Sequence, residues 1–309
     1  MFRSVRFFRL NSPWPGSEEA LSASLESAGF EPCGAYAEQS SGWEPPTGEA
    51  DGRLCRRVDG ADLLRLRTQS RLLPAAAVNE AFEERLNAYR DRTGEEAGRR
   101  QRRKLKEQTR DELLPKALLK SDRTSGIVLA GERLLGIDTL SEPRAERFLE
   151  YLRIALPGLD VTPLAFHRPV GELLTRIFLN DPPPGFALGG ECRMCDPADR
   201  KATVRCADMD LAQPSVRKHV TEGMRLTQLG IEFRGVASCA IDDKGGIAKL
   251  KLVGADVDED LPDEDPLARL DAELALLAGT LRQLLGSMER ALGGYEQGVP
   301  ADERLAAIA

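Results

Sequence analysis

The stretch GRRQRRKLKEQTRDELLPKALLK, residues 98–120, is the segment around which the rest of the sequence is arranged. It holds seven positive side chains within twelve residues, and only Glu107 opposes them there. These side chains are Arg99, Arg100, Arg102, Arg103, Lys104, Lys106 and Arg110. Such a density of like charge predicts either a solvated helix surface or a binding site for a polyanion.

Helical geometry aligns four of these cations. Arg99, Arg103, Lys106 and Arg110 are offset by 0, 4, 7 and 11 residues. On an α-helix they fall within roughly 60° of one another and form a stripe about 16 Å long. Like charges at i and i+4 repel, so the stripe favours a compensating anion, and phosphate is the obvious candidate. A solvated helix face remains the alternative at this point.

The residues on either side indicate a helical insertion. In 75–92 the apolar positions Val78, Phe82, Leu86 and Tyr89 recur at helical spacing. The basic helix is expected to run to about Leu114, where Pro115 kinks or ends it, and residues 116–120 are expected to continue as helix. We therefore predict a helical segment, 75–120, inserted between two β-containing pieces.

The remaining pattern predicts an α+β chain with mixed or antiparallel sheets. Strands are expected at 2–10, 62–68 and 159–166, a hairpin at 125–138 and a meander at 225–233, 236–241 and 247–252. Helices are expected at 17–27, 141–155, 172–179 and 216–221, with short strands and loops in 185–209. A long C-terminal helix, 266–292, should end at Gly293-Gly294 before a disordered tail.

Composition limits the function classes. The 309 residues are 41% hydrophobic and 30% charged, with a net charge of −7. From Asp256 to Glu273 nine acidic residues face one basic residue, Arg269, so the charge is unevenly distributed. No apolar run reaches the roughly 18 residues of a membrane span, and six cysteines without a signal peptide predict reduced thiols in the cytoplasm. A basic segment on an acidic protein predicts a localised polyanion site.

Enzymatic motifs are missing from the sequence. His167 and His219 lie outside any ligand-spaced cluster, and Cys192-Arg193-Met194-Cys195 lacks the second C-x-x-C of a zinc site. The P-loop, the dinucleotide fingerprint and the G-x-S-x-G motif are absent too. We therefore expect no catalytic residues, no metal and no cofactor.

An ordered set of short motifs, none diagnostic alone, resembles the recombination-associated protein RdgC family of bacteria. The motifs are Phe30-Glu31-Pro32-Cys33-Gly34, Gly42-Trp43-Glu44-Pro45-Pro46, Leu72-Leu73-Pro74, Leu113-Leu114-Pro115-Lys116-Ala117 and Ala291-Leu292-Gly293-Gly294. Leu229-Gly230-Ile231-Glu232-Phe233 and Leu270-Asp271-Ala272-Glu273 are also similar to the family's segments. The likeness extends from Phe2 to Gly294.

The resemblance implies a ring. Family members are crescent-shaped α+β chains that pair at both ends into a closed homodimer, and duplex DNA passes through its positively lined hole. Binding is largely independent of sequence and restrains RecA-driven strand exchange, so the chain would be cytoplasmic and nucleoid-associated. It would divide into a central part, 1–74 with 121–166, a tip or gate, 75–120, and a base, 167–309.

The resemblance also extends the candidate sites. Lys116 and Arg205 join the seven cations of the basic helix as DNA-binding candidates, and Leu113, Leu114 and Leu118 are gate candidates. Where the family often has Leu-Leu-Pro-Arg-Ala-Phe, this chain has Lys116, which loses the bidentate fork of arginine, and Leu118, which removes an aromatic anchor. Relatives can carry lysines where Ala207 and Asp208 stand.

Two other classes remain open. The chain could be a protein-interaction adaptor whose basic helix docks on an acidic partner, such as its own Asp256–Glu273 segment. It could also be an RNA-binding module, although aromatic content of 5% and the lack of an RNP-like run place that reading last. The leading hypothesis is a non-enzymatic, sequence-independent double-stranded DNA-binding homodimer.

Overall fold

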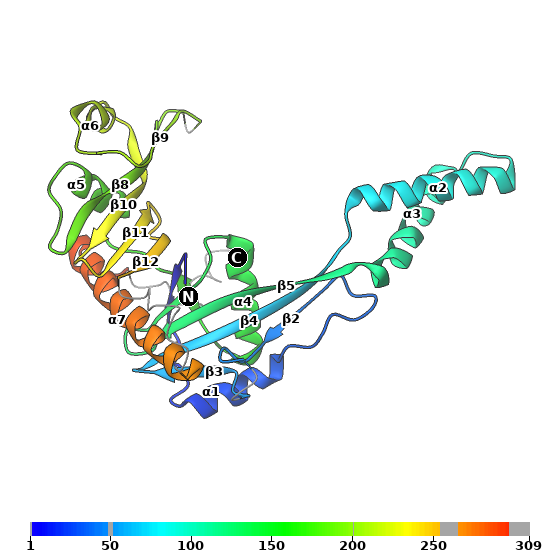
Figure 1. Ribbon diagram of the computed structural model, residues 1–309, viewed down its shortest axis with the longest axis horizontal. Coiled ribbons are helices and arrows are strands. Elements are labelled where there is room, and N and C mark those ends of the chain that lie inside the picture. Colours follow the sequence, from blue (N-terminus) through cyan, green and yellow to red (C-terminus); the bar gives the residue numbers. More distant parts are fainter. Residues whose placement is uncertain (1, 49–51, 200, 254–264, 297–309) are drawn as a thin grey trace, which may run out of the picture. The chain divides into compact units, whose positions relative to one another are not determined.

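The computed structural model describes residues 2–48, 52–199, 201–253 and 265–296 (Figure 1). Contacts divide the chain into two compact units. The large unit comprises 1–27, 45–65 and 124–309, and the small unit comprises 28–44 and 66–123. Two long strands, β4 (Ala61–Leu72) and β5 (Leu118–Leu129), belong partly to each unit. The first nine residues of the predicted acidic segment and the predicted tail from residue 297 lie outside the described residues.

The first sheet of the large unit is built around the N-terminal strand. β1 (Arg6–Leu10) pairs antiparallel with β6 (Leu134–Ile137) on one side and with β7 (Val161–Pro163) on the other. β6 pairs with β5, β5 lies next to β4, and β3 (Cys55–Val58) pairs with the start of β4. The apolar faces of α1 (Glu18–Leu25, followed by the 3₁₀ turn Glu26–Ala28) and α4 (Glu142–Ala155) are buried in this unit.

The second sheet of the large unit has the strand order β12-β11-β10-β8-β9, and every pairing in it is antiparallel. Its strands are β8 (Phe186–Cys195), β9 (Thr203–Cys206), β10 (Arg225–Phe233), β11 (Ala237–Asp242) and β12 (Ile247–Leu252). Its inner face shares one apolar core with α5 (Val170–Phe178), α6 (Pro214–Thr221) and α7 (Pro266–Leu292). The opposite face of the sheet therefore carries the polar residues of alternate positions.

The small unit is a helical hairpin on a β-ribbon. β2 (Gln39–Trp43) pairs with the second half of β4, and Trp43 is buried. Gly42 permits this packing, because a Cβ there would lie 2.4 Å from the Cα of Phe30. Beyond β4, α2 (Ala75–Thr93) ends at Gly94 in the left-handed conformation, and α3 (Arg99–Leu113) returns beside it (Figure 1).

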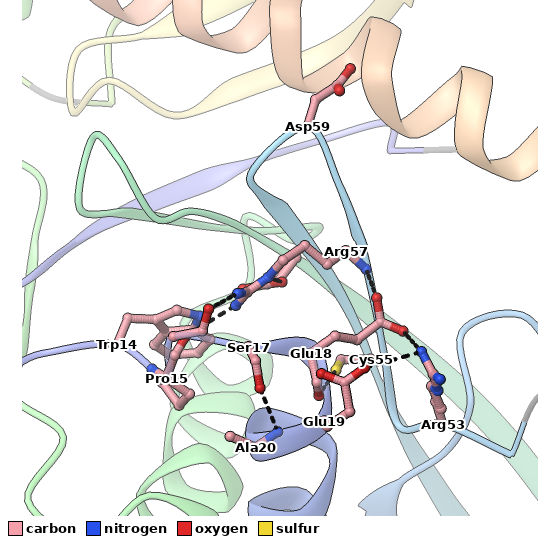
Figure 2. Close-up of polar contacts among 12 residues, drawn as sticks. Trp14, Pro15, Ser17, Glu18, Glu19, Ala20, Arg53, Cys55, Arg57 and Asp59 are labelled. Atoms are coloured by element: carbon pink, nitrogen blue, oxygen red, sulfur yellow. Dashed lines mark hydrogen bonds and ion pairs between the residues drawn. The ribbon is translucent and has the colours of Figure 1, made fainter.

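A buried ion pair fixes the loop before α1 in the large unit. The carboxylate of Asp62 accepts hydrogen bonds from Trp14 Nε1 at 2.7 Å and from Arg57 Nε at 2.5 Å, and its side chain is fully buried. The Arg57 guanidinium also donates to the carbonyl oxygens of Pro15 and Gly16 (Figure 2). The hydrogen bond to Asp62, with the charge of its carboxylate, raises the pKa of Arg57. The constellation satisfies its own donors and acceptors and therefore serves the fold.

Several sequence predictions are confirmed. The α+β class, the two helices of the 75–120 segment, the hairpin over 125–138, the three-strand meander and the C-terminal helix all occur. Helix 266–292 has the predicted bounds and ends at Gly293 in the left-handed conformation. The division into central, tip and base parts stays a prediction.

Other predictions are wrong. Residues 116–120 do not continue the helix: Leu114–Lys116 form a 3₁₀ turn, and β5 begins at Leu118. The reason is Pro115, which lacks the amide donor an α-helix needs and leaves the chain free to pair as a strand. The first strand starts at Arg6 rather than Phe2, because Asp138 accepts the backbone amides of Arg3 and Ser4.

Strand boundaries elsewhere also differ. The segment 185–209 contains the ten-residue strand β8, whose two glycines weaken the strand signal in the sequence. The strand expected at 159–166 is shorter and comprises only β7. β2 lies partly in an expected loop, and β3 was not expected. For β2, pairing with the second half of β4 overrides a weak local preference, whereas β3 forms a tight hairpin with the start of β4.

Candidate nucleic-acid interface

One face of α3 packs within the hairpin. Gln101 and Leu105 are half-buried, Thr109 is buried, and Leu113 is half-buried, so the helix presents positions four residues apart to its own unit. The Thr109 hydroxyl donates to the carbonyl oxygen of Leu105 at 2.7 Å. On α2, Val78 is buried and its predicted apolar neighbours are half-buried. The packing face thus uses few large side chains, and the remainder of α3 faces solvent.

All seven predicted cations of α3 are exposed, but they are not equivalent. Arg103 forms an ion pair with Glu107 at 3.0 Å, and Arg110 forms one with Glu38 at 2.5 Å. The Lys106 ammonium lies 5.8 Å from the centre of the Phe82 ring. Three members of the four-residue stripe therefore have partners in the chain, and these contacts offset part of the like-charge repulsion on the helix.

The four remaining cations of α3 are Arg99, Arg100, Arg102 and Lys104. Within the part of the chain that the structure describes, none of them makes an ion pair or a side-chain hydrogen bond. They occupy the first turn and a half of the helix, where Gly98 supplies no side-chain cap and the first turn holds no acidic residue. The partial positive charge of a helix N-terminus disfavours cations there. A bound anion would relieve that repulsion.

The other two predicted DNA contacts lie on different elements. Lys116 is exposed in the 3₁₀ turn of the small unit, and Arg205 is exposed on the edge strand β9 of the large unit. Both side chains are therefore open to a ligand. Neither lies on α3, so each would contact a ligand from a different surface.

The three predicted gate residues differ in exposure. Leu114 is buried within the chain, with 6% of its surface exposed, and Leu113 is half-buried. Leu118 is 75% exposed and begins β5. Only Leu118 of the three presents most of its surface to a partner.

The sequence reading missed residues around this turn. Leu72, Leu119 and Tyr36 are exposed apolar side chains of the small unit, and Tyr36 is 78% exposed. Arg71 organises the turn, because its guanidinium donates to the carbonyl oxygens of Gly34 at 3.1 Å and Leu114 at 3.2 Å. Nothing in the local sequence indicates these contacts; only the leucines that follow Pro115, Leu118 and Leu119, were a usable signal.

The cysteines show no shared ligand geometry. In the described residues no three His, Cys, Asp or Glu side chains are grouped to hold a metal ion. Cys192 is buried and lies opposite Cys206 across β8 and β9, whereas Cys195 is half-buried. Burial raises the pKa of the Cys192 thiol to about 12, and the neighbouring Cys206 adds to the shift. No helix among the described residues has the length and apolarity of a membrane span.

A family model described as "Putative exonuclease, RdgC" matches residues 1–295. The chain belongs to the RdgC family. The recombination-associated protein RdgC of Pseudoalteromonas atlantica is 29% identical over 283 residues, which cover 91% of this chain and 93% of that protein. The same protein of Laribacter hongkongensis is 30% identical over 284 residues, covering 91% and 94%. The RdgC relatives are thus named for recombination, while the family model is described by a nuclease activity.

Proposed function

We propose that this RdgC-family chain is a non-enzymatic, sequence-independent double-stranded DNA-binding protein that acts as a homodimer. In this proposal two chains close into a ring around the duplex and restrain RecA-mediated recombination on the nucleoid. The tip, 75–120, supplies the main DNA contacts, the base, 167–309, supplies Arg205, and 1–74 with 121–166 connects them. Support comes from the family, whose curated members are named recombination-associated proteins.

The observation that carries the proposal is the placement of charge on α3. Arg99 and Arg100 lie in the first turn of a helix, where cations cost roughly 0.3–1 kcal/mol each. They have no carboxylate partner among the described residues, and neither do Arg102 and Lys104. An arrangement that lowers helix stability is explained if phosphates occupy the site. Guanidinium groups suit phosphate because they donate two parallel hydrogen bonds.

Sequence independence follows from the chemistry of such a surface. Arginine and lysine side chains that contact the backbone phosphates carry no information about base identity. The few apolar side chains on α3 face its own unit, so they cannot supply base contacts. A stacking surface for unpaired bases needs exposed aromatic rings among the cations. Tyr89, on α2, is half-buried and does not offer such a ring. We therefore expect a preference for duplex DNA over single strands.

Dimerisation rests on the exposed apolar residues of the small unit. Tyr36 is 78% exposed and Leu118 is 75% exposed, and Leu72 and Leu119 are about half exposed. Exposed apolar side chains of this kind, beside an ordered turn held by Arg71, suit an isologous contact in which the same patch meets itself. Leu118 is the central residue of this proposed gate.

The test is a binding titration with duplex DNA, single-stranded DNA and RNA at several salt concentrations, with light scattering on the free protein. We expect duplex binding that is insensitive to sequence and falls steeply with salt, from a dimer that leaves the DNA uncut. Shortening of the duplex from its ends in the presence of Mg²⁺ would instead support the exonuclease description. Failure to bind any nucleic acid, with tight binding to an acidic protein segment, would support the adaptor.

A further inference from the structure

The solvent-facing side of the second sheet carries paired arginines. Arg205 on β9 lies directly opposite Arg193 on β8, and Arg193 lies opposite Gln228 on β10. Both arginines are exposed, while the alternate residues Cys192 and Met194 are buried in the core. Residues directly opposite in an antiparallel pair have Cβ atoms about 4.5–5.5 Å apart, and like charges in that position are destabilising.

A third arginine extends this surface. Arg225 on β10 lies opposite Cys195, one outward position along β8 from Arg193. It is exposed and alternates with the buried Leu226. Diagonal neighbours on one face lie about 7–8 Å apart, within reach of long side chains. The surface formed by Arg193, Arg205 and Arg225 is called the arginine face here.

Carboxylates near the arginine face are engaged elsewhere. Glu191, the preceding outward residue on β8, pairs with Lys249. Asp242, next to Gln228 across the sheet, accepts the amides of Lys244 and Gly246 in its own turn. None of the three arginines makes an ion pair within the described ranges. The three arginines therefore carry positive charge that no ion pair within the described residues neutralises, although Glu172 and Asp243 line the same cavity as Arg225.

The backbone beneath the cluster is held in place. The Thr227 hydroxyl donates to the carbonyl oxygen of Arg193 at 3.2 Å, at the bulge between β8 and β10. Cys192 and Cys206 pack side by side under the arginine pair. The two guanidinium groups thus project from strands in a fixed register, so less conformational entropy is lost when they become ordered on a ligand.

We propose that the arginine face is a second phosphate-binding surface, on which Arg193 and Arg205 contact the backbone of duplex DNA and Arg225 extends the contact. The inference rests on the proposed function, but it concerns the large unit and is independent of α3. Two adjacent guanidinium forks match phosphate oxygens better than lysines would. Bound phosphate would offset the repulsion between the adjacent arginines of this face.

The first test replaces Arg193 and Arg205 together with glutamine and measures duplex affinity against salt. Two lost contacts should make the log–log salt slope shallower by about 1.8 per chain. Arg153→Gln, which removes an exposed arginine from α4, is the matched control and should leave the slope unchanged. The double variant Arg193→Lys, Arg205→Lys should keep most of the slope, because it keeps the charge. Circular dichroism checks that each variant is folded.

The second test uses the unaltered protein. Phenylglyoxal modification read by mass spectrometry should show Arg193 and Arg205 protected by duplex DNA and Arg153 still reactive. If the wild type fails to bind duplex DNA, the proposed function itself fails. If it binds, and α3 variants weaken it while Arg193→Gln, Arg205→Gln leaves slope and protection unchanged, only the arginine face is refuted. Aggregation of the double variant with unaltered binding would mean that the arginines protect the sheet edge.

Discussion

Replacing four cations of α3 with glutamine should weaken DNA binding and, at the same time, stabilise the helix. The four residues are Arg99, Arg100, Arg102 and Lys104. These four cations have no side-chain partner among the described residues, and glutamine has nearly the same helix propensity. Each phosphate contact contributes about 0.9 to the salt slope, so losing four should make it shallower by about 3.6 per chain. At 0.15 M salt the same relation gives roughly a fivefold loss of affinity per contact.

The helix itself should gain stability. Removing Arg99 and Arg100 from the first turn relieves an unfavourable interaction with the helix dipole worth roughly 0.3–1 kcal/mol per residue. Hydrogen exchange of the α3 amides should therefore slow in the free variant, while fluorescence anisotropy with labelled duplexes of unrelated sequence shows weaker binding for all of them. A variant that merely unfolded the hairpin would show faster exchange, so the two readouts distinguish the mechanisms.

Two comparisons sharpen the result. The triple variant Arg103→Gln, Lys106→Gln, Arg110→Gln removes cations that already have partners in the chain, so its change in slope per residue should be smaller. Glu83→Gln with Glu84→Gln, on the exposed side of α2, should not weaken binding. Unchanged affinity and slope in the quadruple variant would refute the reasoning and leave α3 as a solvated helix.

Three further outcomes test other parts of the structure. Asp62→Asn should lower the free energy of unfolding by about 3 kcal/mol in chemical denaturation, because it leaves the half-buried Arg57 guanidinium without its buried counter-charge; a loss under about 1 kcal/mol would contradict a stabilising ion pair at this site. Leu118→Asp should shift light scattering from dimer towards monomer without altering the fold, whereas Ile154→Asp, at a half-exposed apolar position on α4, should not. Burial raises the pKa of Cys239 to about 12, so its thiol should react with a disulfide reagent at pH 8 roughly 30–60-fold more slowly than an unperturbed thiol. The half-buried Cys195 and Cys206 should react before it. Urea should abolish the difference, and equal rates in the folded protein would contradict the burial.

The sequence predicted elements whose signals are local. The basic stretch, the apolar spacing of Val78 and Phe82, and the glycine after Leu292 were enough to place α2, α3 and α7 nearly to the residue. Each of these signals acts within a few turns of helix. The prediction that residues 116–120 continue the helix was wrong because their pairing partner, β4, lies far away in the sequence.

The candidate site was less accessible from sequence. The seven cations of α3 could be identified, but not which of them are paired, because Glu38 approaches Arg110 from another part of the chain. The opposition of Arg193 and Arg205 depends on the register between β8 and β9, which their intervening loop does not reveal. In both cases the decisive quantity is the distance between charges on separate elements, and that distance is set by tertiary packing.

A net charge of −7 therefore does not argue against DNA binding. At physiological ionic strength the Debye length is about 8 Å, so a phosphate on α3 responds mainly to charges within the adjacent turns. Within that range the unpaired cations outnumber the carboxylates, since Glu107 is held by Arg103 and Glu112 by Arg85. Carboxylates elsewhere on the chain act in the opposite sense, because they repel DNA from surfaces outside the cationic ones. Under the proposed function, the acidic composition and the basic helix would have the same effect, which is to confine the duplex to a small part of the protein surface.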